Sequence, residues 1–460
     1  MIIKENVQEE TSIFKNVLNM FRRRKFEGNA GQAVKNSTYQ LGQNLIFKFG
    51  SLFYTIILAR ILLPERMGLY SLTLATIILF SSFSDLGISN ALIVFGAKCL
   101  KKKNFSKAKG YLKQLFLWKL TIVALTSFLL ILFSYFISEI YYKKPIFYAL
   151  LVGAIYLPIV SFVGFTESIF RTEENFKLPF IKEGILQIFR LFLVPSVLLF
   201  SLRFAPSDSF LVVLALLFLV VTYSVCLLFL LKNLRSKVSF LKYPATNLSK
   251  KEKKALKKFI IPLTTISMAG LFFGYIDTFM LGHYVAANYI SFYSAALSLV
   301  GGAVGILSFL SISLMPIFAK NSKKGLDNIF KKANLLTWLL SFSAGLVTFL
   351  IARLIIQIVY GTPYLPSVPV LKWFSLLIFL MPIIGLYSTF LIAQKKTKEL
   401  AFLTLGSSFL NILFNLFGIF FGLQIAGEMG AVFGAVGATI LSRVIYLLGL
   451  FLTIRKIKKN

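Results

Sequence analysis

Cysteine and histidine are nearly absent from this chain of 460 residues, which has two cysteines, Cys99 and Cys226, and one histidine, His283. Two cysteines do not make a disulfide framework, so we expect both as free thiols. A single histidine argues against a membrane acyltransferase, which would rely on a buried histidine. No GxxxxGK[ST] phosphate-binding loop occurs, so direct ATP hydrolysis is not expected.

Acidic residues are also scarce, at 17 against 50 Lys and Arg, which gives a net charge of +33. A lipid-linked glycosyltransferase would need carboxylates outside the membrane to hold a metal and a sugar phosphate. The acids expected there are few and scattered: Glu65, Glu139 and Asp208. We therefore expect no enzyme activity, no catalytic residues, no metal site and no cofactor.

Apolar residues are abundant, at 57% of the chain, against 15% charged residues, and the mean hydropathy is +0.80. Soluble domains have roughly 45–50% apolar and about 25% charged residues. A membrane-spanning helix needs about 20 apolar residues, and twelve stretches qualify: 38–62, 68–95, 112–137, 146–169, 179–202, 209–231, 259–283, 289–318, 332–359, 366–393, 400–423 and 429–453. The sequence predicts an all-α membrane protein with about twelve transmembrane helices.

The basic residues are distributed unevenly among the connections between these stretches. The two ends of the chain and every second connection together hold 39 of the 50, whereas the intervening connections hold six. By the positive-inside rule, both termini are cytoplasmic and the protein is a multi-pass protein of the plasma membrane. Charge spread over cytoplasmic loops suits anionic membrane lipids and argues against nucleic acid as a partner.

The longest polar connection, Lys232–Lys258, divides the twelve stretches six and six. We expect a binding region between two lobes. The expected parts are a basic cytoplasmic segment (1–36), an N-terminal lobe (37–231), a basic linker (232–258), a C-terminal lobe (259–453) and a cytoplasmic tail (454–460). Within the first segment, Ile13–Phe26 is either an interfacial helix or a disordered tail.

An internal repeat supports two lobes related by pseudo-symmetry. The stretch from Leu58 to Leu92 has a proline turn at Leu63-Pro64, where a helix cannot continue, and its second helix closes on Asp85-Leu86-Gly87. Aligned without a gap 223 residues downstream, Thr55–Leu74 matches Thr278–Leu297 at five positions, among them Tyr70/Tyr293 and Ser71/Ser294. Such a match indicates an internal repeat.

The run ARILLPERMGLYSLTLA, followed by FSDLG and a lysine-rich loop, resembles the start of the polysaccharide flippases. Their superfamily also holds multidrug exporters and the peptidoglycan-lipid flippase. The segment from Asp277 to Tyr293-Ser294 resembles the family's second half. The resemblance implies translocation of a lipid-pyrophosphate-linked oligosaccharide, a polyprenyl diphosphate glycan, to the outer leaflet by alternating access. It also suggests coupling to a proton or sodium ion, and glycan polymerisation or transfer machinery as a further partner.

Cationic side chains within the spans are the candidate substrate ligands. The first span has a polar stripe with Asn44 and Lys48 near its middle. An unpaired Lys at mid-bilayer costs about 2.5–3.5 kcal/mol on insertion scales, so Lys48 should face water, a partner or a ligand. The other candidates are Lys119, Arg190 and Arg443. By resemblance, the family uses cationic residues in a central cavity to hold the diphosphate of its substrate. We assign this role to Lys48 and Arg190 from their positions on the predicted helices. The alternative is that these two pair with Asp85 and Glu183.

Two acids are candidates for the coupling ion, Asp277 and Asp85. Asp277 resembles a position that is typically acidic in these flippases, and it either carries the ion or pairs with a basic neighbour. Small polar residues along the eleventh span, including Ser408, Asn411 and Asn415, indicate close helix packing or a path for sugars.

Two rival functions remain open. A multidrug exporter of the same superfamily should have an acidic cavity because its drugs are cationic, whereas basic residues outnumber acids in these spans. A polysaccharide-assembly protein with no transport of its own is the other alternative.

The predicted topology can be tested by labelling cysteines placed at Ser249, Ser322 and Ser207. In intact cells, a membrane-impermeant thiol reagent should leave the first two unlabelled, because they lie in the basic connections, and should label the third. Labelling at Ser249 from outside would overturn the division of the spans into six and six.

Overall fold

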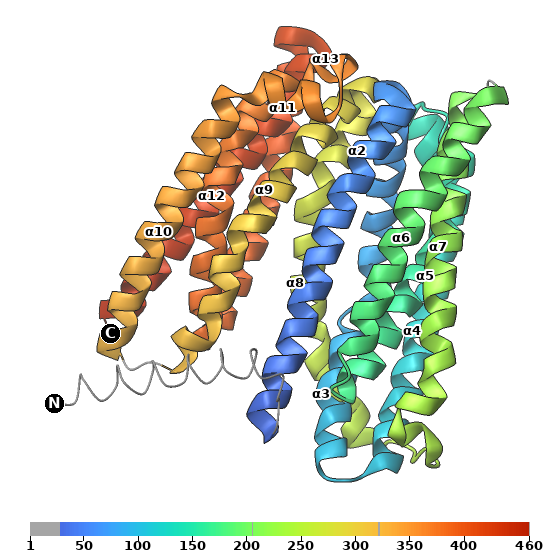
Figure 1. Ribbon diagram of the computed structural model, residues 1–460, viewed down its shortest axis with the longest axis vertical. Coiled ribbons are helices and arrows are strands. Elements are labelled where there is room, and N and C mark those ends of the chain that lie inside the picture. Colours follow the sequence, from blue (N-terminus) through green and yellow to red (C-terminus); the bar gives the residue numbers. More distant parts are fainter. Residues whose placement is uncertain (1–27, 205, 321–322, 460) are drawn as a thin grey trace.

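The protein, seen here in a computed structural model, is described for residues 28–204, 206–320 and 323–459. Its helices form two lobes that stand side by side (Figure 1). One lobe contains α2 (Gly28–Asp85), α3 (Ile88–Lys101), α4 (Phe105–Tyr135), α5 (Phe147–Thr172), α6 (Lys177–Ser201) and α7 (Asp208–Lys237). The other contains α8 (Lys250–Tyr284), α9 (Ala287–Lys320), α10 (Lys323–Leu350), α11 (Ala352–Val359), α12 (Ser367–Ala393) and α13 (Thr397–Lys459). The segment Ile13–Phe26 lies outside the described residues.

Short helices link some of the long ones. They are the π-helix η1 (Phe136–Tyr142) and the 3₁₀-helices η2 (Leu202–Phe204), η3 (Ser239–Lys242) and η4 (Thr362–Tyr364). Nine stretches of the described residues are long and apolar enough to cross a membrane. The protein is therefore a multi-pass membrane protein, as its composition predicts.

The two longest helices are hairpins, and each contains two of the predicted spans. α2 breaks at Leu63, which has φ 62°, directly before Pro64. α13 breaks at Ala426 and Gly427. The hydroxyls of Tyr54 and Tyr70 meet at 3.2 Å across the first turn. With both hairpins counted as two spans, the described helices follow the twelve predicted spans in order, and the predicted fold class is confirmed.

The second predicted span is interrupted at Asp85-Leu86-Gly87. α2 ends at Asp85, Leu86 and Gly87 have φ of 47° and 75°, and the helix resumes as α3. The break leaves the Leu86 carbonyl oxygen without its helical partner. The Thr264 hydroxyl of α8 donates to this oxygen at 2.8 Å. The sequence predicted the end of a helix here, and the structure uses the break to join the two lobes.

The connection between the lobes is held against the N-terminal lobe. Ser249 and Glu252 form a capping box at the start of α8, and Glu252 also pairs with Lys107 of α4. The hydrogen bond from Lys107 lowers the pKa of the Glu252 carboxyl from its ordinary value. The Thr246 amide donates to the Ser106 carbonyl oxygen at 3.1 Å. The linker therefore follows a defined path between α7 and α8.

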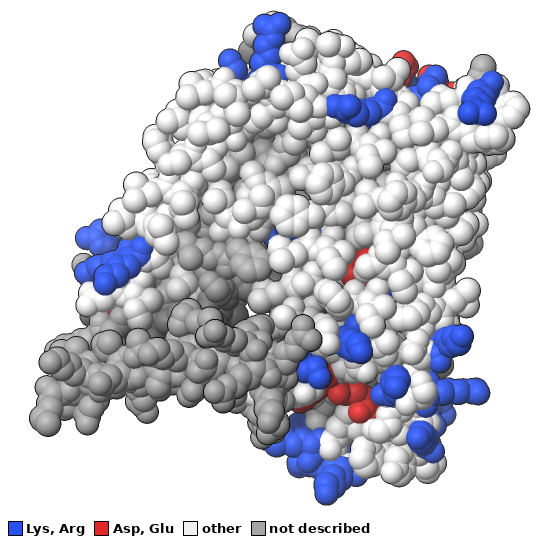
Figure 2. Space-filling model, viewed as in Figure 1, with Lys and Arg blue, Asp and Glu red and all other residues white. Residues whose placement is uncertain are grey.

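The lobes touch closely at the end of the molecule opposite this linker. Arg60 donates to the Val359 carbonyl oxygen at 2.7 Å, and Lys144 donates to the Gly282 carbonyl oxygen at 2.6 Å. A Cβ atom added at Gly68 would lie 1.7 Å from the Ala287 carbonyl oxygen. Because nothing larger than glycine fits there, we describe the lobes as closed at this end. Figure 2 shows the Lys and Arg side chains gathered toward the two ends of the molecule, with a largely uncharged band between them.

Equivalent residues of the two lobes meet each other. The Ser294 hydroxyl donates to the Ser71 hydroxyl at 3.2 Å, and these residues are separated by the 223-residue offset of the repeat. Two points related by a two-fold rotation can touch only near its axis. The hairpin of α2 and the hairpin made by α8 and α9 therefore meet at a pseudo-two-fold axis between the lobes.

Candidate functional site

Lys48 lies on the first arm of α2 and reaches across to the other lobe. Its amine donates to the Ser308 hydroxyl of α9 at 3.3 Å, and its aliphatic chain lies against Gly305. Asn44, one turn earlier, is exposed on the same arm. Among the described residues Lys48 forms no ion pair, so its charge is presented where the lobes face each other.

Arg190 lies on α6 and packs against an aromatic ring. Its guanidinium carbon lies 4.2 Å from the centre of the Tyr54 ring, which is within cation–π distance. Arg190 is 8% exposed, and its Nε has no hydrogen-bond partner among the residues that the structure describes. In the described part of the chain it has no ion pair either. The expectation that Arg190 pairs with Glu183 is therefore not met.

Lys119 and Asp85, predicted to bind substrate and a coupling ion respectively, are paired with each other. The Lys119 amine lies 2.6 Å from Asp85 Oδ1, and the Ser89 hydroxyl donates to the same oxygen at 2.6 Å. Lys119 is 1% exposed, whereas the Asp85 side chain is 40% exposed. The pair joins α4 to the end of α2 just before the break, which favours a structural role for both residues.

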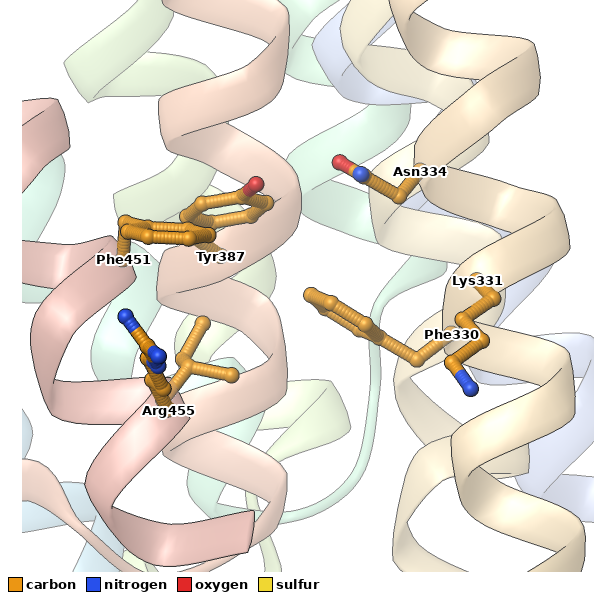
Figure 3. Close-up of a pocket in the computed structure, with 7 residues that line it drawn as sticks. Phe330, Lys331, Asn334, Tyr387, Phe451 and Arg455 are labelled. Atoms are coloured by element: carbon orange, nitrogen blue, oxygen red, sulfur yellow. The ribbon is translucent and has the colours of Figure 1, made fainter.

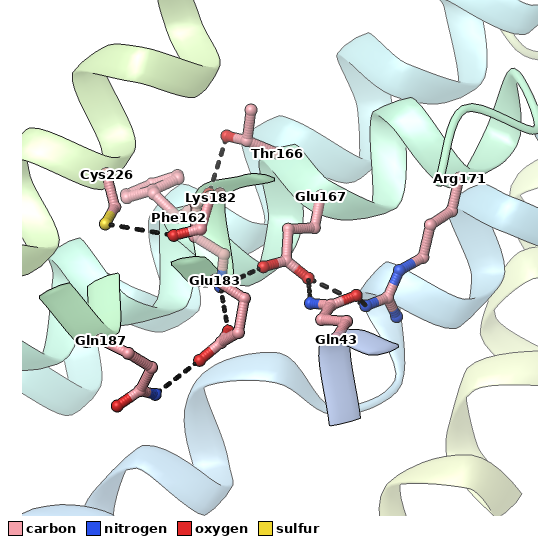
Figure 4. Close-up of polar contacts among 9 residues, drawn as sticks. All are labelled: Gln43, Phe162, Thr166, Glu167, Arg171, Lys182, Glu183, Gln187 and Cys226. Carbon is pink, nitrogen blue, oxygen red and sulfur yellow. Dashed lines mark hydrogen bonds and ion pairs between the residues drawn. The ribbon is translucent and has the colours of Figure 1, made fainter. Parts of the chain in front are cut away.

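A larger buried network joins α2, α5 and α6 and was not singled out from the sequence (Figure 4). The Lys182 amine lies 2.6 Å from Glu167 and 2.8 Å from Glu183. Arg171 donates to Glu167 at 2.9 Å, and Gln187 donates to Glu183 at 2.7 Å. Gln43 of α2 completes the network by donating to Glu167 at 3.3 Å.

Two cations and two carboxylates balance in this network, so it carries no net charge to attract an ion. Removing one member of such a buried group leaves its partner uncompensated, which is strongly destabilising. We therefore interpret the network as the structural anchor of the N-terminal lobe. The available sequence signal was the pair Glu167 and Arg171, four residues apart on one helix.

Asp277 is the centre of a polar cluster in the C-terminal lobe and is 4% exposed. It accepts hydrogen bonds from the Tyr293 hydroxyl at 2.7 Å, the Asn415 amide at 2.6 Å and the Thr439 hydroxyl at 2.6 Å. These donors come from α9 and from the two arms of α13. Arg443 lies near enough to interact with Asp277 electrostatically. Four membrane segments thus converge on one carboxylate.

Two amide oxygens on the first arm of α13 are uncommitted. Those of Asn411 and Asn415 are buried and have no hydrogen-bond partner among the described residues. Asn411 itself donates to the Ser442 hydroxyl at 3.4 Å. A carboxylate with amide and hydroxyl oxygens is a donor set that suits a proton or a small hard cation. The polar stripe of the eleventh span therefore supplies more than close packing, because Asn415 contacts Asp277 directly.

A separate cavity of about 380 Å³ lies at the predicted cytoplasmic end of the C-terminal lobe (Figure 3). Its walls combine the rings of Phe330, Tyr387 and Phe451 with the charged side chains of Lys331 and Arg455. Neither Lys48 nor Asp277 lines it. The cavity is therefore separate from Lys48, which lies between the lobes, and from Asp277, which lies within the C-terminal lobe.

The fold is that of the transporters of the MOP superfamily. It is similar to the lipid II flippase MurJ in an inward closed conformation, with a TM-score of 0.70, 15% sequence identity, and coverage of 92% of this chain and 87% of that chain. It is also similar to an inward-facing multidrug resistance MATE family transporter, with a TM-score of 0.64, 13% identity, and coverage of 92% and 96%.

The sequence identifies the family to which the chain belongs within this fold class. The model of the polysaccharide biosynthesis protein family matches residues 33–322, which is more than half of the chain, and the chain belongs to this family. A comparison with curated proteins found no significant match. The predicted resemblance to polysaccharide flippases is thus confirmed at the level of family and fold.

The pairing of Lys119 with Asp85 predicts how Asp85→Asn will behave. The change leaves a buried ammonium group without its counter-charge, so the thermal unfolding temperature of the purified protein should fall. Replacing both residues, as Asp85→Asn with Lys119→Met, should recover most of the loss because no charge stays buried. An unchanged unfolding temperature in Asp85→Asn would contradict the structural role.

Proposed function

We propose that this protein is a flippase that moves a lipid-pyrophosphate-linked oligosaccharide from the cytoplasmic to the outer leaflet by alternating access. The observation that carries the proposal is the position of Lys48, whose ammonium group contacts Ser308 of the other lobe and pairs with no carboxylate among the described residues. A diphosphate that leaves the headgroup layer needs such a counter-charge, because an uncompensated charge is costly in the bilayer.

Alternating access fits the contacts between the lobes. At the end that carries Arg60 and Lys144, the lobes are closed by hydrogen bonds to backbone carbonyls of the opposite lobe. The opposite end carries the basic connections and is the predicted cytoplasmic side (Figure 2). The glycan lipid enters from this predicted cytoplasmic side, its diphosphate lies near Lys48, and its tail stays in the bilayer. Rocking of one lobe against the other then opens the far end.

Asp277 is the group we propose for ion coupling. It is buried, four segments converge on it, and Asn415, which donates to it, has an amide oxygen with no partner in the described part of the chain. Binding of a proton or sodium ion there changes the charge at the junction of α8, α9 and α13, and so alters how these helices pack. Asp85 is less suited, because Lys119 already neutralises it.

Anionic membrane lipids are the second class of partner that we propose. The cavity in Figure 3 combines Lys331 and Arg455 with aromatic rings at the predicted cytoplasmic surface. Basic pockets between transmembrane helices on the cytoplasmic side suit the phosphates of lipid headgroups. Such lipids would stabilise the C-terminal lobe without entering the path between the lobes.

Substitution of Lys48 tests the proposed substrate site. Lys48→Ala should weaken substrate binding roughly ten- to a hundredfold, because hydrogen bonds to charged groups contribute about 1.5–3 kcal/mol. Lys48→Arg should keep part of the activity and Lys48→Glu should be worst, because it adds repulsion. The measurement is flipping of a lipid-linked oligosaccharide in proteoliposomes, with folded protein quantified in parallel.

Lys372→Ala is the matched control, because Lys372 is also a lysine within a predicted span, and its amine lies over the Phe349 ring, 5.5 Å from the ring centre. It should leave flipping unchanged. Normal flipping by well-folded Lys48→Glu would refute the role of Lys48.

Asp277→Asn tests the coupling proposal. The amide keeps the size of the side chain but cannot take up a proton or hold a cation as a carboxylate does. Flipping should therefore lose its dependence on a proton or sodium gradient. Asp85→Asn serves as the control. It should lower the stability of the protein, but the transport that the folded fraction still performs should depend on the gradient. Gradient-dependent flipping by folded Asp277→Asn would show that the ion binds elsewhere.

A further inference from the structure

A second cavity, of about 360 Å³, lies at the predicted cytoplasmic end of the N-terminal lobe, where the chain turns from α3 into α4 (Figure 1). It shares no residue with the cavity of the C-terminal lobe in Figure 3. Its walls combine three ammonium groups with two aromatic rings and a thiol, and they are formed by Lys98, Lys102, Lys107, Phe95, Tyr111 and Cys99. None of the described residues that line it carries a carboxylate.

The cavity has an apolar floor and a basic rim. The rings of Phe95 and Tyr111 lie 5.4 Å apart, and Tyr111 and Cys99 are buried, at 6% and 9% exposed. Lys98 and Lys102 are exposed and lie four residues apart at the end of α3, so both lie on one face of the helix. Neither forms an ion pair within the described part of the chain. Two ammonium groups are therefore available above a preformed floor.

Lys107 connects this cavity to the helix that begins the other lobe. Its amine pairs with Glu252 in the first turn of α8. The other carboxylate oxygen of Glu252 accepts from the Ser249 amide at 2.9 Å in the capping box. Three lysines and this one carboxylate leave a formal charge of about +2 at the cavity. A phosphate monoester carries about −1.5 to −2 at neutral pH, whereas a diester carries only one negative charge.

We propose that this cavity binds a phosphate monoester on the cytoplasmic side, and that the bound phosphate shares Lys107 with Glu252. The site does not depend on the proposed flippase function. Lysines act as point charges and can approach phosphate oxygens from different sides. Because the phosphate attracts Lys107 and repels the Glu252 carboxylate, its binding weakens the attachment of α8 to α4. The ligand thus acts on the connection between the lobes.

The thiol in the cavity wall provides the assay. Phosphate monoesters occur on soluble metabolites and on phosphatidate, so the probes are glycerol 3-phosphate and phosphatidate, each with the purified full-length protein in phosphatidylcholine nanodiscs. Binding should slow the reaction of Cys99 with N-ethylmaleimide in a saturable manner, measured by mass spectrometry. Cys226, which is fully buried and outside the cavity, is the internal reference and should not change.

The pattern of protection identifies the source of the phosphate. Protection by glycerol 3-phosphate supports a soluble ligand, and protection by phosphatidate alone supports a lipid headgroup. Phosphatidylglycerol, which is a diester, should protect Cys99 much less than phosphatidate does. Protection by neither monoester, or equal protection by phosphatidylglycerol, would overturn the proposal.

Removing the charge of the rim lysines tests the lining. The double variant Lys98→Gln, Lys102→Gln should raise the concentration of probe that gives half-protection about tenfold or more. The double variant Lys101→Gln, Lys103→Gln is the matched control, because it removes the same charge from neighbouring exposed residues that do not line the cavity. It should stay within about twofold of the parent. Equal losses in the two double variants would show that general surface charge, and not the cavity, attracts the probe.

Glu252→Gln tests the sharing of Lys107 by a gain of affinity. Glutamine can replace glutamate in a capping box, so the start of α8 should persist. The change removes the carboxylate that competes for Lys107, and half-protection should need roughly three- to tenfold less probe. Unchanged or weaker binding by folded Glu252→Gln would refute the competition between the phosphate and Glu252.

Discussion

Charge inside a hydrocarbon layer must be compensated, and this constraint shapes both lobes. Lys119 is almost fully buried and is held by Asp85, and Lys182 lies between two glutamates. These pairs fix α2, α4, α5 and α6 relative to one another. Because these acids pair with Lys119 and Lys182, Lys48 and Arg190 form no ion pair within the described residues. The ion pairs thus distinguish the anchoring cations from Lys48 and Arg190.

The contact between the two hairpins gives coupling a simple physical basis. The ion proposed at Asp277 and the diphosphate proposed near Lys48 would act on opposite lobes. Thermodynamic linkage requires that, if one ligand changes the affinity of the other, the effect is mutual. Both ligands act on hairpins that touch at Ser71 and Ser294. A change in packing at one site therefore reaches the other through a short contact.

Much of the fold could be predicted from the sequence because the bilayer imposes a length and a composition on each span. The proline turn at Leu63 and the division at the basic linker follow from local chemistry in the same way. The tripeptide Asp85-Leu86-Gly87 was visible as a helix end and the predicted span 68–95 ran past it, but a second helix, α3, starting at Ile88 was not predicted. That continuation depends on the contact with Thr264, which is far away in the sequence.

The contacts of the candidate site residues were harder to predict than the residues themselves. Lys48, Arg190 and Asp277 stood out because charge is rare in the spans. Which acid each cation faces depends on how the helices are rotated and tilted, and side-chain packing between distant helices decides this. From the sequence, Asp85 and Glu183 were the alternative partners for Lys48 and Arg190. In the structure, Asp85 pairs with Lys119 and Glu183 pairs with Lys182. The aromatic partner of Arg190 had no sequence signal at all.

The contact between Ser71 and Ser294 also shows how this single chain differs from a symmetric dimer. In a symmetric dimer, a residue meets its own copy only at the two-fold axis, in an isologous interface. Here the two serines are a residue and its repeat within one chain. The contact has the geometry of an isologous interface between two six-helix halves that the linker joins in one chain. A homodimer must carry the same residue at both equivalent positions, whereas this chain carries Tyr54 in one half and Asp277 in the other.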